Sequence, residues 1–115
     1  MMLAIARVTV PGMHAWRTQP PGSPRAYLNA PHRHLFHLEV GVVVSHGDRQ
    51  VEILALGQQV RDIVERSYAK APDGEVDFGD RSCEHIAEQI AGALQPFPAY
   101  VRVFEDGENG AEWRG

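Results

Sequence analysis

Hydrophobic and polar positions change their period along this chain, and each change predicts an element of secondary structure. Residues 3–10 (LAIARVTV) are rich in β-branched side chains and predict a strand that ends at the turn-forming pair Pro11-Gly12. Residues 18–31 contain half of the chain's prolines and predict an irregular loop. Residues 33–45 then alternate between apolar and mixed positions, which is typical of a long strand with one buried face.

The period becomes helical in the middle of the chain. Apolar residues recur there at the spacing that places them on one face of a helix: Leu56, Val60, Ile63, Val64 and Tyr68. We expect this helix to end at residues 71–74 (APDG), and residues 50–53 before it to return briefly beside the long strand. A second helix is predicted from Ser82, an N-cap residue with Glu84 in the following turn, and Pro96 stops it.

The end of the chain alternates again. Residues 99–105 (AYVRVFE) predict a strand, and Asn109-Gly110 predicts a hairpin turn into a short last strand at residues 111–113. The order is therefore strand, strand, helix, helix, strand, strand. We expect a single α+β domain over residues 1–115, with two helices packed on one face of an antiparallel four-stranded sheet.

Composition narrows the class of protein. The chain has 115 residues, 43% hydrophobic and 23% charged, as is ordinary for one globular domain. The net charge of −4 gives no support to nucleic-acid binding, and no apolar run approaches the roughly 20 residues of a membrane span. The N-terminal segment lacks the pattern of a signal peptide, and the single cysteine, Cys83, fits a reducing compartment. We therefore expect a cytoplasmic protein with neither nucleic acid nor membrane as its partner.

Histidine is the one residue type in excess, with six in the chain and three of them between residues 32 and 37. Side chains alternate across a strand, so His32 and His34 point the same way, roughly 6–7 Å apart, a spacing that suits two ligands of one metal ion. Two surface histidines that bind nothing are the alternative for such a pair. His37 points to the opposite face and is expected to pack on the sheet or face solvent.

Four segments in this order resemble motifs of one protein family. They are residues 32–40 (HRHLFHLEV), 50–56 (QVEILAL), 81–87 (RSCEHIA) and 101–106 (VRVFED), followed by the aromatic Trp113. The chain thereby resembles a divergent member of the 6-pyruvoyl-tetrahydropterin synthase and 6-carboxytetrahydropterin synthase family, which has the tunnelling fold. Two features of the family are missing: residues 15–31 contain no catalytic cysteine, and residues 69–81 contain no histidine for its Asp-His pair.

The resemblance implies a zinc ion held by three histidines, with His14 as the third ligand beside His32 and His34. A loop histidine without a partner is the alternative for His14. Three histidines and an open position are what a catalytic zinc needs. The resemblance also implies assembly through the sheets into a homo-oligomer, a trimer or a hexamer.

The resemblance further implies a substrate site and leaves the catalytic groups open. Glu105 matches the glutamate that accepts hydrogen bonds from the pterin ring, with an edge-strand carboxylate in solvent as the alternative. Glu84 and Ser82 match the helix start near that ring. The helix dipole alone also explains a carboxylate at position 84. Cys83 and His85 are candidates to replace the missing catalytic groups, with a small buried packing residue as the alternative for Cys83.

The leading hypothesis is a zinc-dependent lyase of pterin metabolism that acts on a dihydroneopterin triphosphate-like substrate, in a route such as queuosine precursor synthesis. A catalytically silent protein that binds a pterin or purine, or acts as a scaffold, is the alternative. A pterin aldolase or epimerase variant with other acid and base groups lies between the two.

Overall fold

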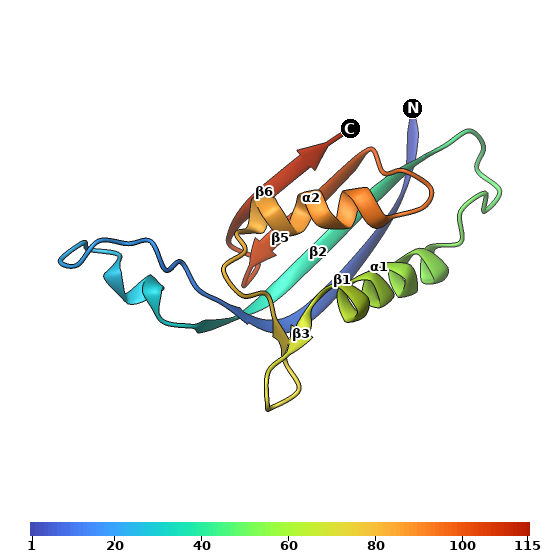
Figure 1. Ribbon diagram of the computed structural model, residues 1–115. Helices are drawn as coiled ribbons and strands as arrows, with labels where there is room; N and C mark the ends of the chain where they lie inside the picture. Colours follow the sequence, from blue (N-terminus) through green and yellow to red (C-terminus); the bar gives the residue numbers. More distant parts are fainter.

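A six-stranded sheet with two helices on one face makes up the computed structural model, which describes residues 1–115. The strands are β1 (Met2–His14), β2 (His32–Val44), β3 (Ala69–Lys70), β4 (Val76–Asp77), β5 (Tyr100–Glu105) and β6 (Asn109–Arg114), and the helices are α1 (Ile53–Ser67) and α2 (Cys83–Ala93). The strand order is β3-β4-β1-β2-β5-β6, antiparallel throughout except between β1 and β4. Figure 1 shows both helices on the same face, with α1 along β1 and α2 against β5 and β6. The predicted α+β architecture is confirmed.

The sheet has six strands where the sequence predicts four. The two additional strands, β3 and β4, come from residues 69–77, which the sequence pattern assigns to the turn after the first helix. Asp73 Oδ1 accepts a hydrogen bond from Glu75 N at 3.0 Å, and Gly74 takes a φ of +87° in the turn between them. A two-residue strand has no alternation to read, so β4 is defined only by its pairing with the distant β1.

The first strand is longer than predicted because Pro11-Gly12 does not end it. Its pairing with β2 continues without a break from Met2 opposite Val44 to His14 opposite His32. Gly12 serves close packing here, since a Cβ added to it would lie 2.7 Å from the ring of Phe78. The strand therefore reaches His14, which the sequence pattern places beyond a turn.

Helix α1 begins at Ile53 and ends at Ser67. Glu52 caps it, because its carboxylate accepts hydrogen bonds from the N–H groups of residues 54 and 55 at 3.0 and 2.6 Å. The return strand predicted at residues 50–53 is therefore wrong. The helix stops before residues 71–74 because Ala69 already belongs to β3.

Helix α2 begins where the sequence predicts, and the last hairpin turns earlier than predicted. Ser82 Oγ accepts a hydrogen bond from His85 N at 3.1 Å, as an N-cap does. In the hairpin, Asp106 and Gly107 take the positive φ values of +55° and +72° that make the turn, and Asn109 already belongs to β6.

The core lies between the sheet and the helices. All ten apolar helix-side positions are buried there: Leu56, Val60, Ile63, Val64, Tyr68, Ile86, Ala87, Ile90, Ala91 and Leu94. Phe36 and Phe78 are fully buried at the end of the core nearest His14. None of the helices has the length and apolar character needed to cross a membrane.

The loop between β1 and β2 has its own internal bonds. Its short 3₁₀ helix (Ala26–Asn29) departs from the predicted irregular structure. The Asn29 side chain exchanges two hydrogen bonds with the backbone of Gln19, at 3.0 and 2.9 Å. Trp16 N donates to Leu28 O at 2.7 Å, which closes the base of the loop. These bonds hold Trp16 and Leu28 next to the ends of β1 and β2.

Candidate metal centre and pocket

Three histidines meet where β1 ends and β2 begins. His14 and His32 are direct partners in the antiparallel register, and His34 lies two residues further on the same face of β2. One ring nitrogen from each lies within 4.8 Å of those of the other two. His14 is 8% exposed and belongs to a strand, so the alternative of a loop histidine without a partner does not hold.

Each of the three imidazoles is oriented by a hydrogen bond from its Nδ1. His14 Nδ1 pairs with Arg81 O at 2.9 Å, His32 Nδ1 with Ala30 O at 3.0 Å, and His34 Nδ1 with an Asp106 carboxylate oxygen at 2.7 Å. A carbonyl or carboxylate oxygen only accepts, so each Nδ1 carries the proton. In the neutral ring the Nε2 lone pair is then free, which is the arrangement found in histidines that bind metals.

The three side chains fit a metal ion. His34 Nε2 is buried without any hydrogen-bond partner, so nothing from the protein uses its lone pair. Burial lowers the pKa of His14, which keeps that ring neutral and able to ligate, although the Arg81 carbonyl and Glu105 act in the opposite direction. Three imidazole nitrogens this close together suit zinc, copper, iron or nickel.

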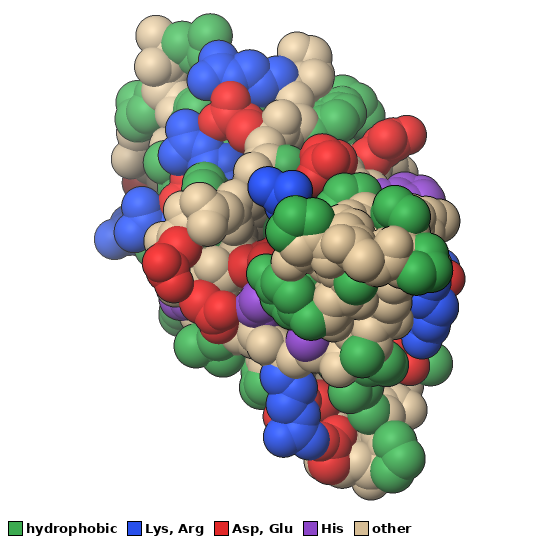
Figure 2. Space-filling model, turned by 90° about the vertical axis from the view of Figure 1, so that its left-hand side faces the viewer, with side chains coloured by type: hydrophobic (Ala, Val, Ile, Leu, Met, Phe, Trp, Pro, Cys, Tyr) green, Lys and Arg blue, Asp and Glu red, His purple; other side chains and the backbone are tan.

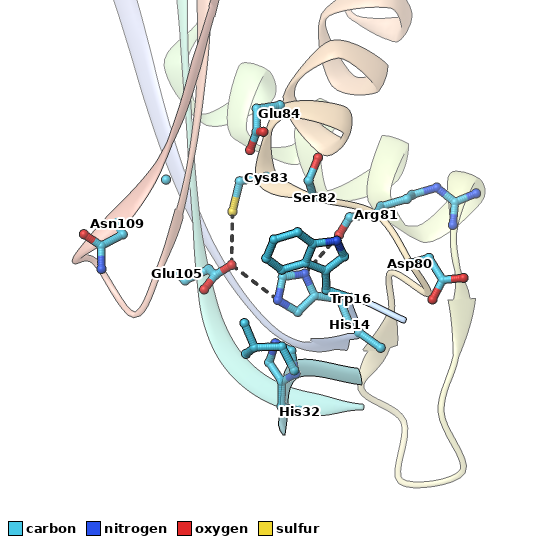
Figure 3. A pocket seen from close by; sticks show the side chains of 13 residues that line it. His14, Trp16, His32, Asp80, Arg81, Ser82, Cys83, Glu84, Glu105 and Asn109 are labelled. Atoms are coloured by element: carbon cyan, nitrogen blue, oxygen red, sulfur yellow. Dashed lines mark hydrogen bonds and ion pairs between the residues drawn. The ribbon is translucent and has the colours of Figure 1, made fainter. Parts of the chain in front are cut away.

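Glu105 points into this group from the end of β5. Its Oε1 lies 3.3 Å from His14 Nε2 and its Oε2 lies 3.2 Å from His34 Nε2. The register that pairs Glu105 with Phe36 places it beside the histidines. Figure 3 shows the carboxylate between Cys83 on one side and His14 on the other. The predicted ring-binding carboxylate therefore lies at the histidine cluster itself.

A cavity of about 480 Å³ opens above the cluster, within the size range of small-molecule sites. Its lining includes six of the eight predicted site residues: His14, His32, Ser82, Cys83, Glu84 and Glu105. His34 lies beneath it against Glu105, whereas His85 is exposed and does not line it. Figure 2 views the molecule from this end, where histidine side chains reach the surface beside acidic and hydrophobic ones.

Cys83 is a neutral thiol in this setting. It is 5% exposed, and its Sγ donates a hydrogen bond to Glu105 Oε1 at 3.6 Å. Burial, and then the nearby Glu105 carboxylate, raise the pKa of Cys83 to about 12. This effect opposes the one expected from the start of α2, where the helix dipole favours a thiolate. At neutral pH the side chain therefore holds a proton and is not a thiolate nucleophile.

Asp106 is a further functional candidate, which the sequence pattern does not predict. One of its oxygens is bound to His34 Nδ1, and the other accepts from Leu35 N at 2.8 Å. The hydrogen bond with His34 is the main cause that lowers the pKa of Asp106. A carboxylate that orients a metal-binding imidazole is a recurring feature of such sites. The acidic pair Glu105-Asp106 at a strand end was the only signal of it in the sequence.

Trp16, Leu28 and Asn109 also line the cavity without having been predicted. Trp16 and Leu28 belong to the loop after β1, and Asn109 is the first residue of β6. In Figure 3 the indole of Trp16 is drawn in front of the His14 ring, at the cavity that both residues line. Trp16 follows His14 by two residues, but only the course of the loop decides that it reaches the pocket.

Comparison with known proteins shows the fold and leaves the family open. No family model matches the chain. No curated protein matches it either. Among solved structures it is similar to the 6-pyruvoyl tetrahydropterin synthase of Caenorhabditis elegans, with a TM-score of 0.66 and 13% identity over 99% of this chain and 95% of that chain. The tunnelling fold predicted from the sequence motifs is therefore confirmed.

Proposed function

We propose that this protein is a zinc-binding lyase of pterin metabolism that acts on a dihydroneopterin triphosphate-like substrate. One observation carries the proposal: three oriented histidines and a carboxylate meet at the floor of a cavity of about 480 Å³. The similarity to a pterin synthase fold adds the class of substrate. A bound zinc would polarise a hydroxyl or carbonyl oxygen of the substrate.

The protein's own groups supply recognition of the ring. Glu105 offers two acceptor oxygens, which suit the paired N–H donors of a pterin or guanine edge. Glu84 and Ser82 stand at the start of α2 on the same wall of the cavity. Trp16 is half exposed beside them and gives a flat aromatic surface to a planar ligand.

Proton transfer falls to Cys83 and His85 in this proposal. Cys83 carries a proton on Sγ at the cavity wall, and in this proposal it donates that proton to a substrate atom. His85 follows Cys83 by two residues in α2, is exposed and does not line the cavity, so it takes part only if its side chain rotates inward. General acid–base groups of this kind contribute on the order of 10² to 10⁴ in rate each.

A catalytically silent pterin-binding or purine-binding protein is the second candidate. It is favoured by the same cysteine, because a thiol with a pKa of about 12 is already protonated at neutral pH and cannot accept a proton from the substrate. The hairpin at residues 69–77 also contains no histidine that could serve as an acid or base. This candidate keeps the metal centre and ring binding but predicts no turnover.

We also propose that the chain is one domain that assembles into a trimer or hexamer through the open face of its sheet. One core of 22 residues supports the single domain. On the open face the exposed apolar side chains Ile5, Leu35 and Val43 flank the partly buried carboxylate of Glu39. The lone, unpaired Cys83 supports a place in the cytoplasm. Light scattering at micromolar concentration tests the assembly, and a monomeric mass would contradict it.

Mass spectrometry of reactions with dihydroneopterin and its triphosphate tests the proposed activity. The lyase proposal expects loss of triphosphate from the second compound by the zinc-loaded protein and not by His34→Ala. Ring binding without product supports the silent protein, and cleavage of dihydroneopterin supports an aldolase variant. A protein that binds neither zinc nor a pterin ring would remove the proposal and leave only the fold.

A further inference from the structure

We propose that Glu105 is itself a metal ligand in the substrate-free protein, so that the site is built from three histidines and one carboxylate. The inference rests on the proposed function in one respect: it takes the histidines to bind a divalent metal. It adds a role for Glu105 beyond that of a ring-binding residue, and it assigns the fourth position of the metal to the protein.

The spacing of the donor atoms supports this assignment. Glu105 Oε1 lies 3.3 Å from His14 Nε2, and Oε2 lies 3.2 Å from His34 Nε2. With metal–ligand distances of about 2.0–2.2 Å, neighbouring donors of a tetrahedral ion are about 3.3–3.6 Å apart. Each carboxylate oxygen therefore lies at about the donor–donor spacing from one histidine, Oε1 from His14 and Oε2 from His34.

Hydrogen bonding does not account for the same contacts. The ring proton of His14 is at Nδ1 on Arg81 O, and that of His34 is at Nδ1 on Asp106. In a neutral ring protonated at Nδ1, the Nε2 atom that faces Glu105 carries a lone pair, and His34 Nε2 has no hydrogen-bond partner although the carboxylate is 3.2 Å away. Lone pairs and an anion that converge at this distance repel one another unless a cation lies between them.

Cys83 positions the carboxylate and does not ligate in this arrangement. Its Sγ is 3.6 Å from Glu105 Oε1, on the opposite side of that oxygen from the histidine rings in Figure 3. A thiol that donates to one carboxylate oxygen directs the other toward the cluster. A thiolate ligand would instead have to replace Glu105 next to His14.

The arrangement also gives Glu105 two successive partners. In the substrate-free protein its oxygens face the histidine cluster, and in the complex they would bind the N–H edge of a pterin-like ring. Binding of the ring then withdraws the carboxylate and leaves a position open at the metal. A metal spectrum that changes on ring binding is the direct consequence.

Metal titration of the full chain, purified without a metal-affinity tag, tests this inference. Zinc affinity is measured by competition with a chelator, without any pterin, for the wild type, Glu105→Gln and the control Glu108→Gln. Glu108 lies in the exposed turn of the same hairpin, so Glu108→Gln removes one negative charge, as Glu105→Gln does, but away from the cluster. We expect Glu105→Gln to weaken zinc binding about 10- to 100-fold and Glu108→Gln to leave it unchanged.

Cobalt substitution identifies the fourth donor. We expect the visible absorption of the cobalt protein to change in Glu105→Gln, and no sulfur-to-cobalt charge-transfer band in the near ultraviolet. Unchanged affinity and spectrum in Glu105→Gln, or a charge-transfer band that Cys83→Ala removes, would overturn the inference while the three-histidine site stands. A wild type that binds no metal would overturn both, and circular dichroism shows whether each variant is folded.

Discussion

The two faces of strand β2 carry the same kinds of residue, but these residues have different surroundings. On the face toward the helices, His32 and His34 lead into fully buried apolar positions such as Phe36. On the open face, His37 and Glu39 stand among exposed apolar residues such as Leu35. The same strand thus contributes to a candidate metal centre on one face and to a surface of charged and exposed apolar side chains on the other.

The difference lies in what surrounds each imidazole. His34 has a carboxylate on Nδ1, a second carboxylate near Nε2 and two more histidines at ring-centroid distances of 5.2 and 5.0 Å. His37 makes no side-chain hydrogen bond or ion pair to the protein, and its register partners are Thr9 and Phe104. His34 is therefore a candidate metal ligand, and His37 is not, because of the elements that converge on the face of His34.

The largest predicted effect is on metal binding. We expect His34→Ala to lose the bound zinc, because it removes one of the three proposed ligands, which the strand pairing holds beside His14 and His32. His37→Ala, three residues away on the other face, should bind zinc as the wild type does. Elemental analysis of protein purified without a metal-affinity tag measures both, and full zinc content in His34→Ala would show that the ligands are wrongly assigned.

The same comparison holds for packing. Phe36 is 0% exposed and packs between the histidine rings and Phe78, so Phe36→Ala should cost about 3–5 kcal/mol of unfolding free energy. Leu35 is 43% exposed, and Leu35→Ala in a monomer should change it by less than about 0.5 kcal/mol. Denaturant unfolding measures both values. A cost at Leu35 near that at Phe36 would show that the open face is buried in an assembly.

Much of the fold was predictable because its signals are local. The helical stripes from Leu56 and from Ile86 both face the core, and Ser82 caps α2 as its position suggests. The continuation of β1 through Pro11-Gly12 was not predictable. Gly12 is needed because the ring of Phe78, 66 residues away in the chain, leaves no room for a Cβ there. Short strands such as β4 depend on a distant partner in the same way.

In the site, too, the local features were predictable and the contacts between distant segments were not. The shared face of His32 and His34 follows from the alternation of a single strand. The partner of His34, Asp106, is 72 residues away, and the approach of Glu105 to the cluster depends on the register between β2 and β5. Sequence alternation gives the face of a residue but not the register of its neighbour strand, so these two contacts required the structure.

A smaller effect on the metal separates orientation from ligation. Asp106→Asn should weaken zinc binding about 10- to 100-fold without abolishing it, because asparagine has one acceptor oxygen where Asp106 uses two, on His34 and on Leu35 N. Asparagine tolerates the φ of +55° at this position, so the turn should be preserved. Chelator competition measures the affinity, and a wild-type value would remove Asp106 from the site.

The smallest predicted effect concerns Glu39 on the open face. Its carboxylate is 12% exposed and accepts hydrogen bonds from Arg7 Nε at 2.6 Å, Tyr100 OH at 2.7 Å and Arg102 at 3.1 Å. Burial alone raises the pKa of Glu39, but the bonds from Tyr100 and Arg7 and the nearby arginine charges outweigh it and lower the pKa below its ordinary value of 4.5. We expect Glu39→Gln to lose about 1 kcal/mol of unfolding free energy at pH 7.

The pH dependence of that loss identifies its cause. A carboxyl group whose pKa is lowered by folding stabilises the folded state above its unfolded pKa, and this stabilisation disappears as pH falls through the folded value. The wild type should therefore lose its advantage over Glu39→Gln as pH falls below about 4.5, since the glutamine does not titrate. Denaturant unfolding of both proteins from pH 7 to pH 3 measures the difference. A constant gap across that range would mean that Glu39 acts through its shape and not its charge, and that the open face, unlike the histidine face, does not depend on an ionised carboxylate.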